Sequence, residues 1–187
     1  YGKTSLDMRP PSGRQLSILT PKPLPAVEDI EGTVEDALRD PVGSPPLEEI
    51  VAAGGKVTIV ASDITRYSGT EHFMPVLLNE LNRCGVRDED VTILFALGIH
   101  RKHTLEEQEM LVGRKTADRI RLTDHDPKND ANLIYYGKTS RGTPVYINRI
   151  AARCDSLILT GTTTLHYFAG FGGGRKALIP GVAGYRT

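Results

Sequence analysis

The chain has 187 residues, and its 39% hydrophobic and 25% charged residues are typical of a globular protein rather than a disordered one. Its 23 basic and 23 acidic residues give a formal net charge of zero, which argues against binding nucleic acid or an acidic membrane through bulk charge. Cys84 and Cys154 form no metal-binding or disulfide motif. No apolar run approaches the roughly 18 residues that cross a bilayer, and no signal peptide opens the sequence. We therefore expect a cytoplasmic protein.

Residues 1–32 are rich in proline and polar residues. The alternating run at 15–20 predicts a short strand, and the prolines after it predict an extended arm, because proline donates no backbone hydrogen bond and cannot sit in a central strand. We expect this arm to precede a separate domain over 33–187. The sequence begins without methionine and ends at Thr187, directly after its most motif-rich stretch, so we also expect a piece of a longer protein that lacks its C-terminal domain.

Short runs of mostly apolar, β-branched residues predict buried strands at 57–60, 91–97 and 156–160. The segment 133–147 predicts a hairpin that turns at 140–142. Strands of this length and composition are typical of a buried sheet.

Capping residues and apolar residues at helical spacing predict the helices: from Thr33 onward, 44–53, around 74–85, 104–112 and 148–153. Ser44 as N-cap and Pro45 as the first helical residue begin the second of these helices, and Pro75 is expected in the first turn of the third. Thr104 and Glu107 form a capping box at the start of the fourth.

Continuous apolar strands that alternate with amphipathic helices are typical of a parallel sheet covered on both faces. The predicted fold class is therefore α/β: a Rossmann-like, doubly wound, mostly parallel sheet with helices on both faces. Ligands of such sheets bind beyond the carboxyl ends of the strands. A polar motif follows each of the three predicted strands; the motifs are 62–66, 98–101 and 166–176. We therefore expect these motifs to meet at one edge of the sheet.

Asp63 and Arg66 in the first motif and His100 in the second are candidate functional residues. An arginine at a strand end offers a planar fork suited to a carboxylate or phosphate. Asp63 can orient that arginine or a neighbouring imidazole, and the alternative is a loop salt bridge with a helix cap. His100 can act as a general acid or base at neutral pH, or it can bond a loop carbonyl. The histidines outside the motif positions are predicted to face solvent: His72, His103 and His125.

The third motif contains Gly172, Gly173 and Gly174 together with His166 and Lys176. Glycines let backbone N–H groups approach an anion closely. The stretch lacks the Gly-Lys-Ser/Thr of a Walker loop and the last glycine of Gly-x-Gly-x-x-Gly, so it is not an ordinary ATP or NAD site. Lys176 is then a nucleophile, a covalent anchor or a phosphate contact.

The segments 40–49, 63–66, 98–101 and 166–181 together resemble, in this order, the N-terminal half of the nickel-dependent lactate racemase family. The stretch His-Tyr-Phe-Ala-Gly-Phe-Gly-Gly-Gly-Arg-Lys with its following Pro-Gly is highly specific, and the resemblance covers 33–187. It implies an isomerase that racemises a small 2-hydroxy acid, lactate or a relative. It also implies a nickel pincer nucleotide, pyridinium-3,5-bisthiocarboxylic acid mononucleotide with nickel, as cofactor.

The resemblance further implies a role for each matching residue. Lys176 holds the cofactor covalently through a thioamide, His100 and His166 are the alternating acid and base, and Arg66 binds the substrate carboxylate. Residues expected to contact the cofactor are Asp63, Ile64, Thr65, Arg66, Gly172, Gly173 and Gly174. The family's nickel-ligating histidine lies beyond Thr187, so no metal ligand is expected within this chain.

In this family one histidine takes the hydroxyl proton while hydride moves to the cofactor, and the planar keto acid takes hydride back on its other face. The family often has Asp-His-Thr-Arg-Pro at the first motif; Ile64 and Tyr67 stand here instead, which leaves room for a 2-hydroxy acid other than lactate. Because part of the site lies outside the chain, we expect residues 1–187 alone to be inactive. The alternative is a nucleotide- or anion-binding Rossmann-like module without catalysis, and the missing glycine pattern disfavours an NAD-dependent dehydrogenase.

Overall fold

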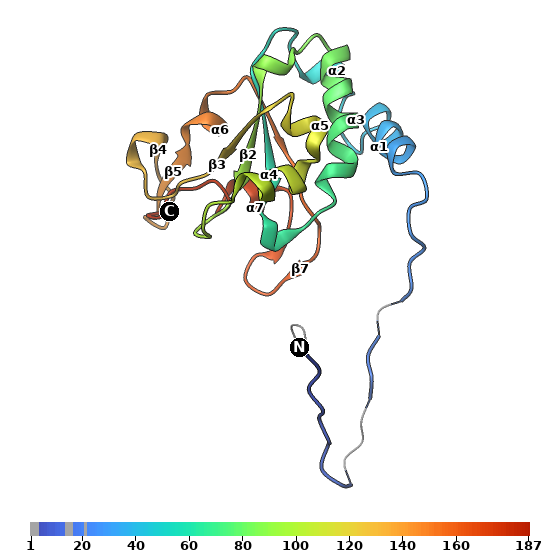
Figure 1. The fold of residues 1–187 in the computed structure, drawn as a ribbon. Coiled ribbons are helices and arrows are strands. Elements are labelled where there is room, and N and C mark those ends of the chain that lie inside the picture. Colours follow the sequence, from blue (N-terminus) through green and yellow to red (C-terminus); the bar gives the residue numbers. More distant parts are fainter. Residues whose placement is uncertain (1–3, 14–16, 21) are drawn as a thin grey trace.

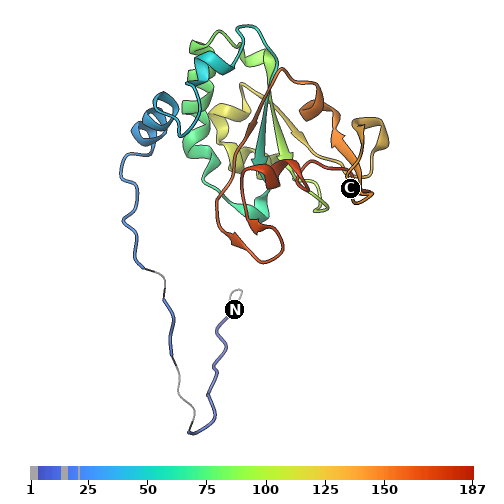
Figure 2. The ribbon, with the colours of Figure 1, turned by 180° about the vertical axis from the view of Figure 1, so that it is seen from behind.

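The computed structural model describes residues 4–13, 17–20 and 22–187 (Figure 1). The described residues ahead of the first helix are exposed and extend away from the rest of the chain, as Figure 2 also shows from behind. The strand expected at 15–20 lies partly outside the described residues, and the described part, 17–20, forms no strand.

The centre of the fold is a four-stranded parallel sheet with the strand order β3-β2-β1-β6. Its strands are β1 (Val57–Ser62), β2 (Val91–Ala96), β3 (Arg121–Asp124) and β6 (Ser156–Leu159). The chain adds β2 and then β3 on one side of β1, and later returns to add β6 on the other side. The order therefore reverses between β1 and β6, which is where open α/β sheets bind their ligands.

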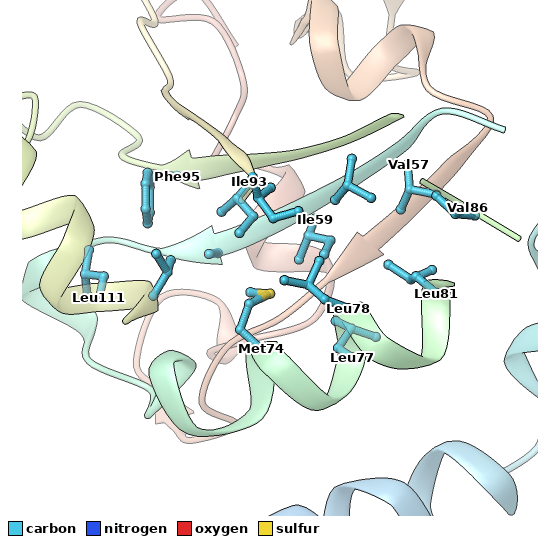
Figure 3. Packing of buried hydrophobic residues seen from close by; sticks show 14 of the residues in the cluster. Val57, Ile59, Met74, Leu77, Leu78, Leu81, Val86, Ile93, Phe95 and Leu111 are labelled. Carbon is cyan, nitrogen blue, oxygen red and sulfur yellow. The ribbon is translucent and has the colours of Figure 1, made fainter. Parts of the chain in front are cut away.

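Helices cover both faces of this sheet: α3 (Thr70–Arg83), α4 (Leu105–Val112) and α5 (Arg114–Ala117) on one, α6 (Arg149–Arg153) and α7 (Arg175–Leu178) on the other. Successive strand residues point to opposite faces. Ile59 and Ile93 therefore pack into the first core, between the sheet and α3 (Figure 3), while Val60 and Leu94 pack into the second. All four side chains are fully buried, and the predicted doubly wound α/β fold is confirmed.

Strand β3 has no counterpart among the sequence-based expectations. Its residues are Arg-Leu-Thr-Asp, so only Leu122 is apolar, and the strand lies at an edge of the sheet. An edge strand this short carries neither a buried apolar run nor a clear alternation, which are the two patterns that identify strands.

The helix expected to begin at Thr33 begins earlier. It is α1 (Ile30–Arg39), and its N-cap is Asp29, whose carboxylate accepts the N–H of Gly32 at 2.9 Å. Aspartate is among the best N-cap residues, so the cap at Asp29 adds nearly a turn ahead of the expected start.

Two further expectations about helices are wrong. The helix expected over 44–53 is only α2 (Leu47–Ile50), and the hydroxyl of Ser44 donates to the carbonyl of Pro45 at 2.9 Å instead of capping it. Pro75 lies in the second turn of α3, because that helix begins at Thr70.

The remaining predicted elements are confirmed: the capping box of Thr104 and Glu107 on α4, the hairpin of β4 (Leu133–Lys138) and β5 (Pro144–Asn148), and Asn148 as N-cap of α6. Short elements complete the fold: η1 (Ile64–Arg66), η2 (Asp88–Asp90), η3 (Asp130–Asn132), β7 (Leu165–His166) and β8 (Gly170–Phe171). Within the described part of the chain, no helix has the length and apolar character to cross a membrane.

Candidate active site

A cleft of about 650 Å³ opens at the carboxyl ends of β1, β2 and β6, where the strand order reverses. Of the residues predicted for the site, it is lined by Asp63, Thr65, Arg66, His100, His166, Gly172, Gly173 and Lys176. The three sequence motifs therefore meet at one edge of the sheet, as expected. A cleft of this volume accommodates a small organic ligand or a mononucleotide.

Two of the predicted site residues do not line the cleft. The side chain of Ile64 packs against the core beneath α3. Gly174 is the N-cap residue of α7, with a φ of 48°. Both residues therefore lie next to cleft-lining residues in the chain but do not themselves line the cleft.

Asp63 and His100 form a hydrogen-bonded pair across the ends of β1 and β2. The Asp63 side chain is 2% exposed, and its Oδ2 lies against Nδ1 of His100, whose side chain is 43% exposed. The other oxygen, Oδ1, accepts the N–H of Thr65 at 3.0 Å and the Thr65 hydroxyl at 2.8 Å. Because an ionised carboxylate only accepts, His100 carries its proton on Nδ1 and presents Nε2 as an acceptor.

Arg66 follows in the same turn. Its guanidinium donates to the carbonyl of Thr65 at 3.0 Å and to the Thr65 hydroxyl at 3.2 Å. In the described ranges it makes no ion pair, so most of its donors remain available to an anion.

Tyr67, the next residue along the chain, also lines the cleft. Its hydroxyl donates to the carboxylate of Glu71, one turn into α3. That hydrogen bond raises the pKa of the Tyr67 phenol, so the phenol stays protonated. The tyrosine adds a fixed aromatic ring to the cleft wall.

His166 lies on the short hairpin of β7 and β8 and lines the cleft. Its Nδ1 accepts the N–H groups of Phe168 and Ala169, each at 3.2 Å. In the neutral ring the proton is therefore on Nε2. The ring stacks on Tyr167, with the centroids 5.3 Å apart, and this hairpin exposes its aromatic side chains to solvent.

The glycine loop before α7 packs closely against the loop after β6. A Cβ at Gly173 would lie 3.0 Å from the carbonyl oxygen of Thr162, and a Cβ at Gly172 would lie 3.3 Å from it. Glycine at both positions therefore lets the two backbones approach. Lys176, in the first turn of α7, is half-buried beside them, and its ammonium has no hydrogen bond or ion pair among the described residues.

Sequence reasoning missed two segments of the cleft wall. Thr160, Thr162 and Thr164 come from the loop after β6. The segment after α7 contributes Pro180, Gly181, Ala183, Gly184, Tyr185 and Thr187. A Thr-Gly-Thr-Thr-Thr run directly after a buried strand was a signal for the first segment, because strand ends form ligand sites. In the second segment only Pro180-Gly181 stood out, as the end of the stretch that resembles the family. Gly98 N–H donates to the carbonyl of Gly181 at 2.8 Å and so joins this segment to the loop after β2.

Two of the histidines expected to face solvent are buried. The His103 side chain is 0% exposed and bonds Asp124, and His125 is 1% exposed and bonds the carbonyl of Ala183 at 2.8 Å. Both rings have hydrogen-bond partners on both nitrogens, which is what allows their burial. His72 is exposed as expected, at 53% of its side chain.

The loop that carries His100 is fixed to α4 by charged hydrogen bonds. Arg101 donates to both carboxylate oxygens of Glu107, at 2.7 and 2.6 Å, and Glu107 also accepts the N–H of Thr104 at 2.9 Å. The Arg101 guanidinium and then that N–H lower the pKa of Glu107 to about 2. In the ranges that the structure describes, no three His, Cys, Asp or Glu side chains gather to hold a metal ion.

Comparisons with known proteins identify the family of this chain. The lactate racemase N-terminal domain family matches residues 1–187. A lactate racemase from Lactiplantibacillus plantarum is 37% identical over 155 residues, 83% of this chain and 36% of that protein. One from Thermoanaerobacterium thermosaccharolyticum is 32% identical over 185 residues, 98% of this chain and 43% of that protein. The chain thus spans about two-fifths of the length of these curated relatives.

Solved structures share the fold. The lactate racemase apoprotein from Thermoanaerobacterium thermosaccharolyticum superposes with a TM-score of 0.76 at 34% identity, over 82% of this chain and 37% of that chain. A protein from Thermotoga maritima superposes with a TM-score of 0.65 at 27% identity, over 82% of this chain and 38% of that chain. Sequence and fold thus agree, and this chain belongs to the lactate racemase N-terminal domain family.

Proposed function

We propose that this chain is the N-terminal part of an isomerase that racemises a small 2-hydroxy acid, lactate or a close relative. The observation that carries the proposal is the meeting of His100, His166, Arg66 and Lys176 on one cleft. Two relatives are named lactate racemase, which supports the reaction class. A module that only binds an anion would need the cation and the glycine loop, but not the buried Asp63 behind His100.

Arg66 is the proposed partner of the substrate carboxylate. Its guanidinium is exposed at the cleft, and only one of its nitrogens, Nη1, donates hydrogen bonds to the adjacent Thr65. A planar fork binds a carboxylate through two parallel hydrogen bonds and so fixes the orientation of the acid. The hydroxyl at C2 is then held at a defined distance from the histidines.

His100 is the proposed acceptor of the substrate's hydroxyl proton. Its Nδ1–H is directed at Asp63, so the lone pair on Nε2 is available for that proton. Asp63 holds the tautomer and stabilises the imidazolium once the proton has moved, as a buried carboxylate behind a catalytic histidine does. Thr65 fixes the carboxylate by occupying its other oxygen.

His166 is the proposed second acid–base residue. It lines the cleft from the β7–β8 hairpin, which follows β6, whereas His100 follows β2 on the other side of β1. Racemisation needs the hydroxyl of either enantiomer to find a proton acceptor or donor, and two histidines on different elements provide one for each.

A nickel pincer nucleotide, the cofactor that the family resemblance implies, fits the residues present. Among the described residues the Lys176 amine has no hydrogen-bond or ion-pair partner, and it lines the cleft, as a covalent tether requires; the backbone of Gly172 and Gly173 lines the same cleft, where N–H groups can approach an anion. When bound, this group supplies a hydride acceptor, so the hydrogen at C2 does not have to leave as a weakly acidic proton. We propose that the nickel-ligating histidine and the remaining substrate contacts belong to the part of the protein that follows this chain.

The free thiols of Cys84 and Cys154 fit a reducing compartment, and we propose the cytoplasm.

The first test is the intact mass of the full-length protein, produced together with the cofactor-making enzymes. We expect a mass excess of nucleotide size in the parent and none in Lys176→Ala. Lys115→Ala, which removes an exposed lysine on α5, is the matched control and should keep the excess. A parent without the excess, or an excess that survives Lys176→Ala, would contradict the tether.

Chiral chromatography of lactate and longer 2-hydroxy acids, incubated with the same full-length protein, tests the reaction itself. We expect conversion of each enantiomer toward an equal mixture, and no conversion by residues 1–187 alone. Turnover by residues 1–187 would show that the site is complete without the rest of the protein, and no turnover of any 2-hydroxy acid by the loaded full-length protein would exclude the racemase.

A further inference from the structure

His103 has a fully buried side chain beside the 63–66 turn, and neither the family resemblance nor the proposed mechanism uses it. Its ring is 0% exposed and lies between the loop that carries His100 and the η1 turn. Phe95 of β2 meets it edge-on, with the ring centroids 4.9 Å apart. A buried imidazole persists only where both nitrogens have partners.

The partner on one side is Asp124, at the carboxyl end of β3. Its Oδ1 accepts Nδ1–H of His103 at 2.8 Å, and its Oδ2 accepts the backbone N–H of the same residue at 2.7 Å. Gln108 donates to Oδ1 as well, at 3.1 Å. The carboxylate therefore fixes the tautomer of His103, with the proton on Nδ1 and a lone pair on Nε2.

The partner on the other side is the backbone of the η1 turn. Nε2 of His103 accepts the N–H of Ile64 at 3.1 Å. This amide is the first of η1, and the next two are already satisfied: Thr65 N–H by Asp63 Oδ1, and Arg66 N–H by the Asp63 carbonyl, at 3.0 and 2.9 Å. Without His103 the Ile64 amide would be a part-buried donor with no acceptor.

The loop after β2 thus holds the turn at two adjacent residues. His100 contacts the carboxylate of Asp63, and His103 contacts the amide of Ile64. Because His103 accepts the Ile64 amide, Asp63 can give one oxygen to Thr65 and keep the other for His100.

We propose that His103, with its proton fixed by Asp124, is a positioning residue that holds the 63–66 turn and thereby aligns Asp63 with His100 and directs Arg66 into the cleft. The proposal builds on the racemase function proposed above, in which Asp63, His100 and Arg66 act on the substrate. His103 itself touches neither the cleft nor the reacting atoms.

The test uses the full-length, cofactor-loaded enzyme with His103→Phe and His103→Gln. Phenylalanine keeps the ring against Phe95 but has no acceptor for the Ile64 amide, whereas glutamine offers a carbonyl oxygen at the position of Nε2. We expect His103→Phe to lower kcat roughly 10- to 100-fold, as the loss of a supporting partner behind a functional group commonly does, and His103→Gln to recover most of that loss. A glutamine variant as slow as the phenylalanine variant would overturn the proposal.

A variant of lower stability with an intact turn separates positioning from folding. Leu81→Ala empties a fully buried site near the start of β1, at the end of the sheet away from the cleft (Figure 3), and should lower Tm while leaving kcat within about twofold. If Leu81→Ala loses as much kcat as His103→Phe at an equal loss of Tm, His103 is merely structural and the proposal fails.

Amide hydrogen exchange gives a readout that needs no activity. We expect the Ile64 amide to be protected in the parent and in His103→Gln, and to exchange at least 10-fold faster in His103→Phe. Unchanged exchange at Ile64 in His103→Phe would overturn the positioning role even if the parent is an active racemase. A parent that racemises no 2-hydroxy acid would refute the proposed function, while the exchange rates would still decide whether His103 holds the turn.

Discussion

His100 and His166 line the same cleft, but their Nδ1 atoms have opposite hydrogen-bonding partners. Nδ1 of His100 lies against the carboxylate of Asp63, which accepts, whereas Nδ1 of His166 itself accepts the backbone N–H groups of Phe168 and Ala169. A neutral imidazole carries one N–H, so Nε2 of His100 is an acceptor and Nε2 of His166 is a donor. The neutral pair is thus set to take a proton at His100 and to give one at His166.

Asp63→Asn should remove this asymmetry. The new amide oxygen can still accept from Thr65, but its NH₂ donates to Nδ1 of His100 and moves the histidine's proton to Nε2. We expect kcat of the full-length enzyme to fall on the order of 100-fold or more, which is the contribution of a well-placed general base, with a smaller change in KM. The tautomer is checked by ¹⁵N NMR of protein labelled at histidine.

Asp36→Asn is the matched control, because Asp36 is an exposed carboxylate that pairs with Arg39 on α1, away from the cleft. Its kcat and the His100 signal should stay at the parent values. An Asp63→Asn enzyme with a shifted tautomer and an unchanged kcat would show that His100 is not the proton acceptor.

Arg66→Gln should weaken substrate binding more than it slows the chemistry. The neutral amide cannot form the charged, two-point contact with a carboxylate, and such charged hydrogen bonds contribute about 1.5–3 kcal/mol. We expect KM for the 2-hydroxy acid to rise roughly 10- to 100-fold, from steady-state rates measured in both directions. Arg83→Gln, which changes an exposed arginine on α3, should leave KM unchanged; an equal rise in both variants would remove Arg66 from the substrate site.

Much of this fold was predictable from local pattern. The β1 and β2 strands are mostly apolar because both of their faces are buried, and the start of α4 carries both halves of a capping box in its own sequence. What pattern missed depends on distant partners. Strand β3 is in the sheet because it pairs with β2, and its own sequence shows almost no apolar content.

The site divides in the same way. That Asp63, His100 and Lys176 line the cleft could be predicted, because each belongs to a recognisable motif that follows a predicted strand. The burial of His103 and His125 could not, because the groups that satisfy their rings come from residues far along the chain. For His103 the carboxylate of Asp124 is 21 residues away, and for His125 the carbonyl of Ala183 is 58 residues away. A lone histidine in a polar stretch gives no sign of such partners.

Gly173→Ala should disrupt the glycine loop before α7. Gly173 has a φ of 69°, and an added Cβ would lie 3.0 Å from the Thr162 carbonyl oxygen, so alanine brings both backbone strain of about 1–2 kcal/mol and a clash with backbone. We expect the mass excess on Lys176 to fall severalfold. Gly170→Ala is the control, since Gly170 has a φ of 77° but open space around the added Cβ. Equal cofactor loading in the two variants would mean that the close approach of the loops does not matter.

His125 should make the protein less stable as the pH falls through the range in which free histidine titrates. Burial lowers the pKa of His125 below its ordinary 6.5, although its hydrogen bond to the Ala183 carbonyl and the charge of Asp126 act in the opposite direction. The unfolded chain therefore binds a proton that the folded chain does not bind, so the free energy of unfolding contributed by this group is intact above pH 6.5 and declines below it.

Calorimetry on the full-length protein at pH 7.5 and pH 5.5 measures the drop in Tm. We expect this drop to be smaller in His125→Asn than in the parent, once the overall loss of stability in that variant is subtracted. His72→Asn, at an exposed histidine, should keep the drop seen in the parent. The same drop in His125→Asn as in the parent would assign the acid sensitivity to other groups.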